Sequence, residues 1–276
     1  MRTKGRPRVT WPHSRPDCWP QFGLNSQADA IYRACSEVMS MSTARPPAAR
    51  GGRFAEVGRV VGLLLAGAIV LWALFVGLGE LIVHFWVHSR FGRADGSVDR
   101  YFAGHRSGTG NTVTLVVVYF ADTITVAVLT AVVAVGVFLA VRRLREPLFL
   151  VAAVAGEVLT FLAVTSIVDR HRPAVVRLDA SPPTSSFPSG HTAAAVCVYG
   201  GIALLCGVLI RRRNVRRLMW VVAGALPVLV AVGRLYRGMH FPTDVLAGGV
   251  LGVLWLTWLM KVYPLGKAPA RARTRA

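Results

Sequence analysis

Hydrophobic residues gather into six long runs along the chain, and short polar or basic segments separate them. Each run approaches the ~20 residues that a helix needs to cross the hydrocarbon core of a bilayer. A helix satisfies its own backbone hydrogen bonds in lipid, whereas an isolated strand does not. We therefore predict an all-α, polytopic membrane protein whose six transmembrane helices form a bundle, at about 58–84, 112–141, 147–168, 191–210, 217–236 and 243–263.

Composition supports this class of protein. Of the 276 residues, 54% are hydrophobic and 16% are charged, and the mean hydropathy is +0.50. The net charge of +19 would also suit a nucleic-acid partner. However, the basic residues cluster beside the apolar runs, which is typical of topology signals in membrane proteins. We expect the bilayer as a partner and no nucleic acid.

Both ends of the chain are polar and basic. Residues 1–50 mix Pro, Arg, Ser and Trp without a sustained period, so we predict a flexible cytoplasmic tail there and a second basic tail at 265–276. Residues 51–264 then form the membrane domain. No apolar stretch follows the first basic residues, so we expect no secretory signal peptide. Met39 or Met41 could be the biological start instead of Met1.

Basic clusters predict the orientation in the membrane. Short loops rich in arginine stay in the cytoplasm, and such clusters occur at 142–145 and 211–217. Six spans then place both termini in the cytoplasm. The opposite face of the cell membrane, which is periplasmic or extracellular, holds three connections: 85–111, 169–190 and 237–242.

The first of these connections, 85–111, mixes aromatic and charged residues. Its Phe, Trp and Tyr side chains could anchor it at the interface, and "GSVDRYFAGHRSG" could form a short amphipathic helix. We interpret it mainly as a loop with interfacial anchors. A contribution to lipid entry is the alternative.

The second connection ends in "PSGH", directly before an apolar run. Ser189 can act as the N-cap of the following helix, and Gly190 allows a ligand to approach closely. Backbone N–H groups and the positive end of the helix dipole would then face outward and bind an anion. His191 could donate a proton to the oxygen that leaves this anion. Alternatively, Ser189 and Gly190 only start a helix and His191 faces interfacial water.

The third connection carries a histidine and an aspartate four residues apart, His240 and Asp244. A carboxylate at this spacing can accept one imidazole N–H, fix the tautomer and leave the other nitrogen free as a nucleophile. A helix-capping aspartate beside an interfacial histidine would show the same spacing. A metal site is a further alternative, but arginines surround these residues where a metal needs carboxylates or more histidines.

Arginines accompany both histidines. Arg172 and Arg234 lie at the ends of predicted helices, and Arg170 and Arg237 are close to them in sequence. A guanidinium binds phosphate oxygens in bidentate fashion and stabilises charge in phosphoryl transfer. Arginines that snorkel to the interface are the structural alternative. That alternative explains Arg237 better than it explains Arg172 and Arg234.

The ordered set "RP", "PSGH" and R-x5-H-x3-D resembles the type 2 phosphatidic acid phosphatase family. This family is the membrane branch of a superfamily that includes vanadium haloperoxidases and soluble acid phosphatases. The resemblance covers about residues 58–263. The family motifs match Arg172 and Pro173, then 188–191, and finally the three residues Arg234, His240 and Asp244.

Two positions depart from the family pattern. Thr165 stands where the K-x6-RP motif has lysine, and Gly233 replaces the serine that precedes the third-motif arginine. The missing lysine removes one expected phosphate contact, for which Arg170 is the candidate substitute. These changes concern affinity and choice of substrate more than the reaction.

The resemblance implies hydrolysis of a lipid phosphate or diphosphate through a phosphohistidine, without a metal or cofactor. His240, oriented by Asp244, would attack phosphorus, and His191 would protonate the leaving oxygen. The phosphate would be held by five groups: Arg172, Arg234, Arg170, Ser189 and the Gly190 amide. A polyprenyl diphosphate, phosphatidic acid, phosphatidylglycerol phosphate or a phosphorylated glycolipid would suit such a site. A phosphotransferase using the same intermediate, or a non-catalytic lipid-binding homologue, is the alternative.

Overall fold

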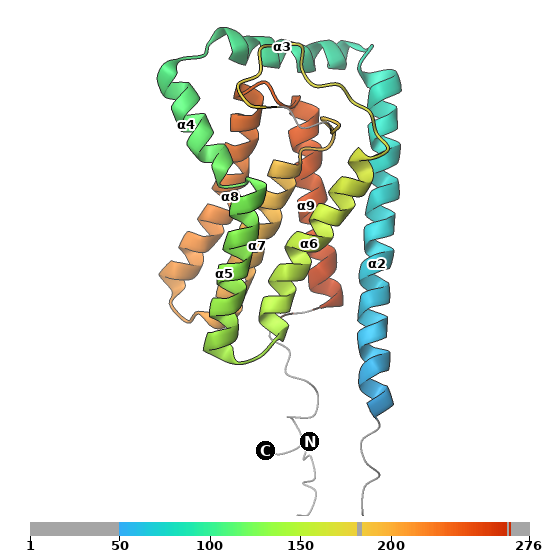
Figure 1. Ribbon diagram of the computed structural model, residues 1–276, viewed down its shortest axis with the longest axis vertical. Coiled ribbons are helices and arrows are strands. Elements are labelled where there is room, and N and C mark those ends of the chain that lie inside the picture. The colour runs from blue at the N-terminus through green and yellow to red at the C-terminus, as the bar shows by residue number, and fades with distance from the viewer. Residues whose placement is uncertain (1–49, 181–183, 264, 266–276) are drawn as a thin grey trace, which may run out of the picture. The chain divides into compact units, whose positions relative to one another are not determined.

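The computed structural model describes residues 50–180, 184–263 and 265, and over these residues the chain is helical and contains no strand (Figure 1). The predicted all-α class is confirmed. The predicted tails lie outside the described residues. The elements, in chain order, are α2 (Arg50–Leu81), the π-helix η1 (Ile82–Trp86), α3 (Arg90–Gly104), α4 (Gly108–Tyr119), α5 (Thr123–Val141), α6 (Arg145–Thr165), α7 (Gly190–Leu209), α8 (Arg213–Tyr236) and α9 (Pro242–Val262).

Six helical segments are long and apolar enough to cross a bilayer, as predicted. Five of them end within four residues of the predicted limits. They are Phe54–Trp86, Arg145–Thr165, Gly190–Leu209, Arg213–Tyr236 and Pro242–Val262. The sixth, Thr123–Val141, is shorter than predicted.

The predicted second span, 112–141, is in fact two helices. Asp122 has extended backbone angles, and its carboxylate accepts the N–H of Ile124, so it is the N-cap of α5. An N-cap residue cannot continue the preceding helix, and α4 therefore ends at Tyr119. The sequence signal was the Asp-Thr pair inside an otherwise apolar run.

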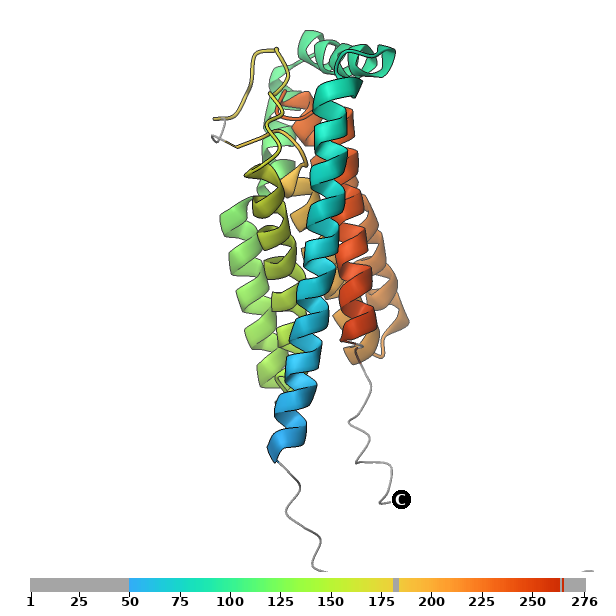
Figure 2. The same cartoon turned by 90° about the vertical axis from the view of Figure 1, so that its right-hand side faces the viewer.

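The 85–111 connection is more ordered than the predicted loop. Ser89 caps α3 by accepting the N–H groups of Phe91 and Gly92, and α3 lies across one end of the bundle (Figure 2). The proposed short amphipathic helix therefore exists, but it starts earlier. Its two buried residues are acidic, Asp95 and Asp99.

Helix α7 is the centre of the bundle and packs against α5, α6, α8 and α9. Small residues along it allow neighbouring helices to approach closely, as is common between membrane helices. A Cβ atom at Gly201 would lie 2.8 Å from Leu150 of α6, and one at Gly200 would lie 2.8 Å from Leu256 of α9. This close packing fixes where α7 begins, and its first residues belong to the second motif.

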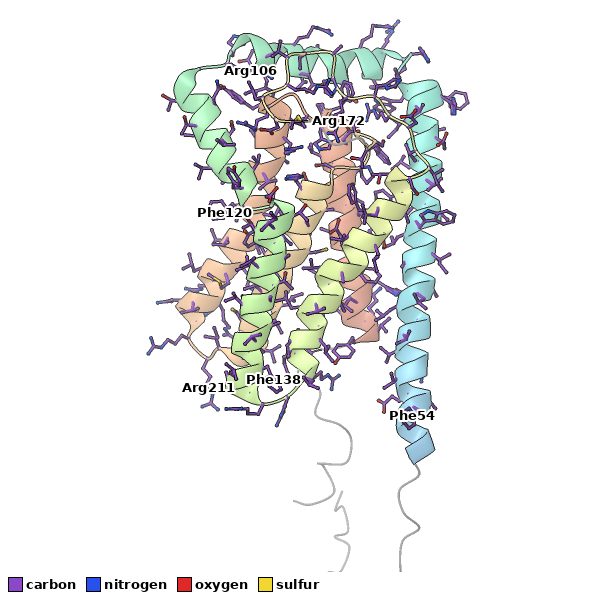
Figure 3. All side chains as sticks on the ribbon, viewed as in Figure 1. Phe54, Arg106, Phe120, Phe138, Arg172 and Arg211 are labelled. Atoms are coloured by element: carbon purple, nitrogen blue, oxygen red, sulfur yellow. The ribbon has the colours of Figure 1, made fainter. Side chains whose placement is uncertain are left out.

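The three motif-bearing segments meet at the end of the bundle that α3 covers. Arg172 lies at this end, whereas Arg211 of the basic 211–217 segment lies at the opposite end (Figure 3). The motifs and the basic 211–217 segment thus lie at opposite ends of the bundle, as the predicted orientation requires.

Candidate active site

Backbone hydrogen bonds join the three motifs to one another. The N–H of Ser186 donates to the carbonyl of Arg170 at 2.9 Å, which ties the first motif to the second. The N–H of Ser189 donates to the carbonyl of Asp244 at 2.9 Å, which ties the second to the third. Arg172 donates through NH1 to the carbonyl of Met239 at 2.8 Å. Segments far apart in the sequence thus form one site.

His240 is 3% exposed, and its tautomer follows from its hydrogen bond. Nδ1 lies 2.7 Å from the carbonyl oxygen of Ser186. Because a carbonyl only accepts, Nδ1 carries the proton, and Nε2 of the neutral ring has a free lone pair. The nearest oxygen of Asp244 lies 3.9 Å from Nδ1. The direct partner of His240 is therefore the Ser186 carbonyl, and Asp244 acts at longer range than expected.

The electrostatic surroundings keep His240 neutral. Burial is the main cause that lowers the pKa of its imidazole well below the usual range, and the positive charges of Arg234 and Arg172 lower it further. The hydrogen bond to Ser186 acts in the opposite direction. A neutral imidazole with a free Nε2 is the form that can act as a nucleophile.

Asp244 is fully buried and occupies the first turn of α9. Its Oδ2 accepts the N–H of Phe241 at 2.9 Å, so it satisfies an N-terminal N–H group of the helix. Its Oδ1 accepts a hydrogen bond from Arg170. The helix-capping role and the position beside His240 therefore coexist in one side chain.

All three arginines predicted as phosphate ligands, Arg170, Arg172 and Arg234, have an unused donor. Their Nε–H groups are buried and have no hydrogen-bond partner among the described residues. Arg172 and Arg234 both bond to Met239, the residue before His240: Arg172 donates to its carbonyl, and the carbonyl of Arg234 accepts its N–H. A buried donor without a partner is costly, and an anion bound between these groups would remove that cost.

Asp179 holds Arg234 from the side of the 169–190 connection. Its Oδ2 accepts a hydrogen bond from NH1 of Arg234 at 3.2 Å, and its carboxylate accepts from Nε of Arg237 at 2.8 and 2.9 Å. Arg237 is therefore buried and ion-paired, and the interpretation of it as an arginine that snorkels to the interface is wrong. Sequence reasoning missed Asp179 because no spacing connects a loop aspartate to an arginine 55 residues later.

Ser189 occupies the N-cap position of α7, but its side chain caps no backbone N–H. Its hydroxyl lies 3.1 Å from the hydroxyl of Thr192. Close packing explains the glycine at position 190, because a Cβ atom there would lie 2.8 Å from the ring of Phe161. The uncapped first turn leaves N–H groups of α7 for an anion, beside His191.

Arg170 lies in the site with a different set of partners from those expected of a phosphate ligand. Its NH1 donates to Asp244 and, at 2.7 Å, to the hydroxyl of Thr243, while NH2 donates to Asp95 at 3.0 Å. Each terminal nitrogen of Arg170 thus donates a hydrogen bond to a different carboxylate. This pairing favours a positioning role for Arg170 over the phosphate-binding role predicted for it.

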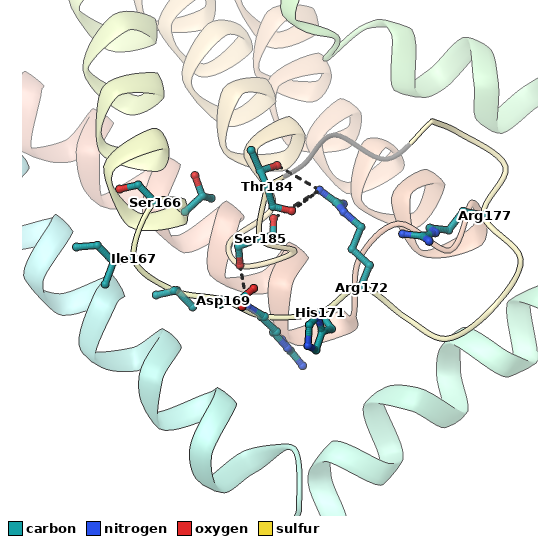
Figure 4. Close-up of a pocket in the computed structure, with 11 residues that line it drawn as sticks. Ser166, Ile167, Asp169, His171, Arg172, Arg177, Thr184 and Ser185 are labelled. Atoms are coloured by element: carbon teal, nitrogen blue, oxygen red, sulfur yellow. Dashed lines mark hydrogen bonds between the residues drawn. The ribbon is translucent and has the colours of Figure 1, made fainter.

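A polar cavity of about 360 Å³ lies beside these residues and is lined by the first motif (Figure 4). Arg172 lines it, as does Thr165 at the position where the family has lysine. His240 and His191 do not line it. The cavity therefore adjoins the histidine pair and does not coincide with it.

The second departure from the family pattern also has a structural reason. A Cβ atom at Gly233 would lie 2.9 Å from a methyl group of Val118 on α4. A serine at this position would therefore require α4 or Val118 to shift. Glycine here accompanies the close packing of α4 on α8.

Helix α3 buries two acidic side chains that sequence analysis did not single out, Asp95 and Asp99, and of the two it is Asp95 that bonds Arg170. Both oxygens of Asp99 are buried without a hydrogen-bond partner among the described residues. Burial, followed by the nearby carboxylates of Asp244 and Asp95, raises the pKa of Asp99 to about 7. The four-residue spacing of the two aspartates on an amphipathic helix was the signal that could have identified them.

Taken together, the fold and the site define a polytopic helical membrane protein with an arginine-lined histidine site at one end of its bundle. Residues 146–267 match the sequence profile of the PAP2 superfamily. This segment, which is under half of the chain, holds all three motifs.

Two characterised proteins are similar to parts of the chain. Phosphatidylglycerophosphatase B of Bacillus subtilis is 46% identical over 77 residues, which cover 28% of this chain and 37% of that protein. An undecaprenyl-diphosphatase of Sulfolobus acidocaldarius is 32% identical over 111 residues, covering 40% and 49%. The chain thus spans less than half the length of either relative.

A solved structure resembles the chain over a larger part. The crystal structure of the first transmembrane PAP2 type phosphatidylglycerolphosphate phosphatase from Bacillus subtilis superimposes with a TM-score of 0.61 at 24% identity. The match covers 72% of this chain and 97% of that one. At this identity the likeness supports the fold: a helical membrane protein of the same architecture.

Proposed function

We propose that the protein is an integral-membrane lipid phosphatase that hydrolyses a phosphate or diphosphate head group through a phosphohistidine. One observation carries this proposal: a buried, neutral His240 with a free Nε2 lies near the guanidinium groups of Arg172 and Arg234, whose buried Nε–H donors have no partner among the described residues. A nucleophile next to unpaired cationic donors suits attack on a tetrahedral anion.

The chemistry follows from the positions of the two histidines. Nε2 of His240 attacks phosphorus, and the bond from phosphorus to the lipid oxygen breaks. His191 gives its proton to that oxygen. Water then attacks the phosphohistidine, returns a proton to His191 and releases inorganic phosphate. Arg172, Arg234 and the first turn of α7 hold the phosphate oxygens throughout.

The names of the relatives support the choice of substrate class. A phosphatidylglycerophosphatase and an undecaprenyl-diphosphatase both act on a phosphorylated lipid, one a monoester and one a diphosphate. We therefore propose a lipid monophosphate or diphosphate for this chain. Because arginines, histidines and backbone N–H groups of α7 supply every proposed phosphate contact, we propose that the chemical step needs no metal.

A panel of lipid phosphates in detergent with EDTA tests the proposal. We expect the purified protein to release inorganic phosphate from at least one of phosphatidic acid, phosphatidylglycerol phosphate and a polyprenyl diphosphate. Label that moves from the lipid to an added alcohol, with no free phosphate, would show a phosphotransferase. Binding of these lipids without release of phosphate over hours would show a non-catalytic homologue, and a strict need for Mg²⁺ would contradict the histidine nucleophile.

We also propose that the site faces away from the cytoplasm, because the basic loops lie at the other end of the bundle. In a variant without its four native cysteines, Ala180→Cys in the 169–190 connection should react with an impermeant maleimide in intact cells. Leu144→Cys, exposed in the basic loop, is the matched control and should react only after lysis. The reverse pattern would overturn the orientation.

A further inference from the structure

Asp95 of α3 contacts the N-terminal end of α9, which carries Asp244. Asp95 is 6% exposed, and its carboxylate makes three contacts with that end. Oδ1 accepts the N–H of Thr243 at 3.3 Å, and Oδ2 accepts both the hydroxyl of Thr243 and NH2 of Arg170. Thr243 directly precedes Asp244. Asp95 therefore fixes the start of α9 and one side of the Arg170 guanidinium.

Arg170 connects Asp95 to Asp244. Its guanidinium is 4% exposed, lies over the ring of Phe241 at 4.4 Å and donates to one carboxylate with each terminal nitrogen. Because a guanidinium is planar and rigid, the two carboxylates fix its position from both ends. The other oxygen of Asp244 holds the N–H of Phe241, next to His240. A continuous chain of contacts thus runs from α3 to the nucleophile.

We propose that Asp95 is a positioning residue for the reaction: through Arg170 it holds Asp244, and with it the loop that carries His240, in the geometry needed for attack. This inference rests on the proposed phosphatase function. It assigns α3, which lies outside the matched PAP2 segment, a part in the site. It also gives Arg170 a role that does not require contact with phosphate.

The observations favour positioning over phosphate binding for this pair. Both terminal nitrogens of Arg170 face carboxylates, and only its Nε–H is without a partner among the described residues, so an anion held by a terminal nitrogen would have to displace a carboxylate. Displacing a carboxylate would leave it buried and unpaired, which is strongly unfavourable. Among the described residues, Arg172 by contrast donates to carbonyl groups and a hydroxyl, and Arg234 pairs with one carboxylate, that of Asp179.

Asp95→Asn tests the proposal, with hydrolysis of a lipid phosphate and inhibition by inorganic phosphate as the two measurements. A displacement of about 1 Å at a reacting group can cost ~10²-fold, so we expect kcat to fall about 10- to 100-fold. KM and the inhibition constant of inorganic phosphate should stay within about threefold, because no phosphate ligand is lost. Asp95→Glu, which keeps the charge, should recover part of kcat.

Asp99→Asn is the matched control. It makes the same change on the same buried face of α3, one turn further on, at a side chain that does not bond Arg170. Its kcat should stay within about threefold of the wild type. An equal loss in both variants would show that packing of α3 is responsible, and would overturn the positioning role.

Arg170→Gln and the double variant Asp95→Asn/Arg170→Gln complete the test. If Asp95 acts through Arg170, the double variant should be no slower than Arg170→Gln alone, whereas independent roles would multiply the two losses. Multiplied losses, an undiminished kcat in Asp95→Asn, or an inhibition constant that rises in step with the loss of kcat would each overturn the inference. Absence of turnover in the wild type would instead overturn the proposed function, and the inference with it.

Discussion

Replacing His240 with alanine should abolish turnover of every phosphate substrate, with a loss greater than about 10⁴-fold. The reason is that His240 presents a free Nε2 while its Nδ1–H is held by the Ser186 carbonyl. Without that nitrogen no covalent intermediate forms, whatever the leaving group. Release of inorganic phosphate from a lipid phosphate and from p-nitrophenyl phosphate measures the loss.

A second measurement separates loss of the nucleophile from loss of folding. Wild-type protein quenched during turnover of ³²P-labelled substrate should retain acid-labile, base-stable label, as a phosphohistidine does, and His240→Ala should retain none. His105→Ala, at an exposed histidine that ends α3, is the control and should behave as the wild type. Near-normal turnover in His240→Ala would contradict the proposed mechanism.

His191→Ala should show a loss that depends on the leaving group. General acid catalysis contributes typically ~10²–10⁴-fold, and we expect a loss of about this size for a lipid phosphate monoester, whose alkoxide leaves poorly. With p-nitrophenyl phosphate the loss should be distinctly smaller, because p-nitrophenolate departs without protonation. The ratio of the two losses, from kcat/KM on each substrate, is the diagnostic quantity.

The location of His191 makes this comparison necessary. It follows Ser189 and Gly190 at the start of α7, where the uncapped N–H groups lie, so it could bind phosphate oxygens as well as donate a proton. Equal losses on both substrates would assign it mainly to phosphate binding. In that case the leaving oxygen would take its proton from another source.

Local signals in the sequence predicted much of the architecture, because helix formation in lipid depends on short stretches of chain. Hydrophobic length located the six spans, and the start of α7 follows the predicted N-cap position, Ser189, although its side chain caps no backbone N–H. The break at Asp122 was missed because averaging over a long apolar run hides one capping residue. The full extent of α3 was not predicted, because its buried residues are acidic and do not produce the apolar pattern that indicates a helix.

The site was predictable where chemistry follows spacing along the chain. His240 and Asp244 are four residues apart, and the order of the motifs placed Arg172, Arg234 and His191 with them. The direct partner of His240 was not predictable, because it is a backbone carbonyl and any residue could supply one. Contacts of Asp95 and Asp179 with arginines depend on how distant segments fold together, and no local pattern encodes them.

The length of α5, which starts after the break at Asp122, and the level of the histidine site have a consequence for how a lipid reaches the protein. Helix α5 alone has 19 residues, which is about 28 Å at ~1.5 Å per residue and close to the ~30 Å hydrocarbon thickness. The histidine site lies where the spans α7 and α9 begin, and we expect lipid head groups at this level. A phosphorylated lipid would therefore reach the site by diffusing within the plane of the membrane. Its rate of capture would follow mole fraction among the surrounding lipids, so diluting the substrate with inert lipid would slow the reaction at constant bulk concentration.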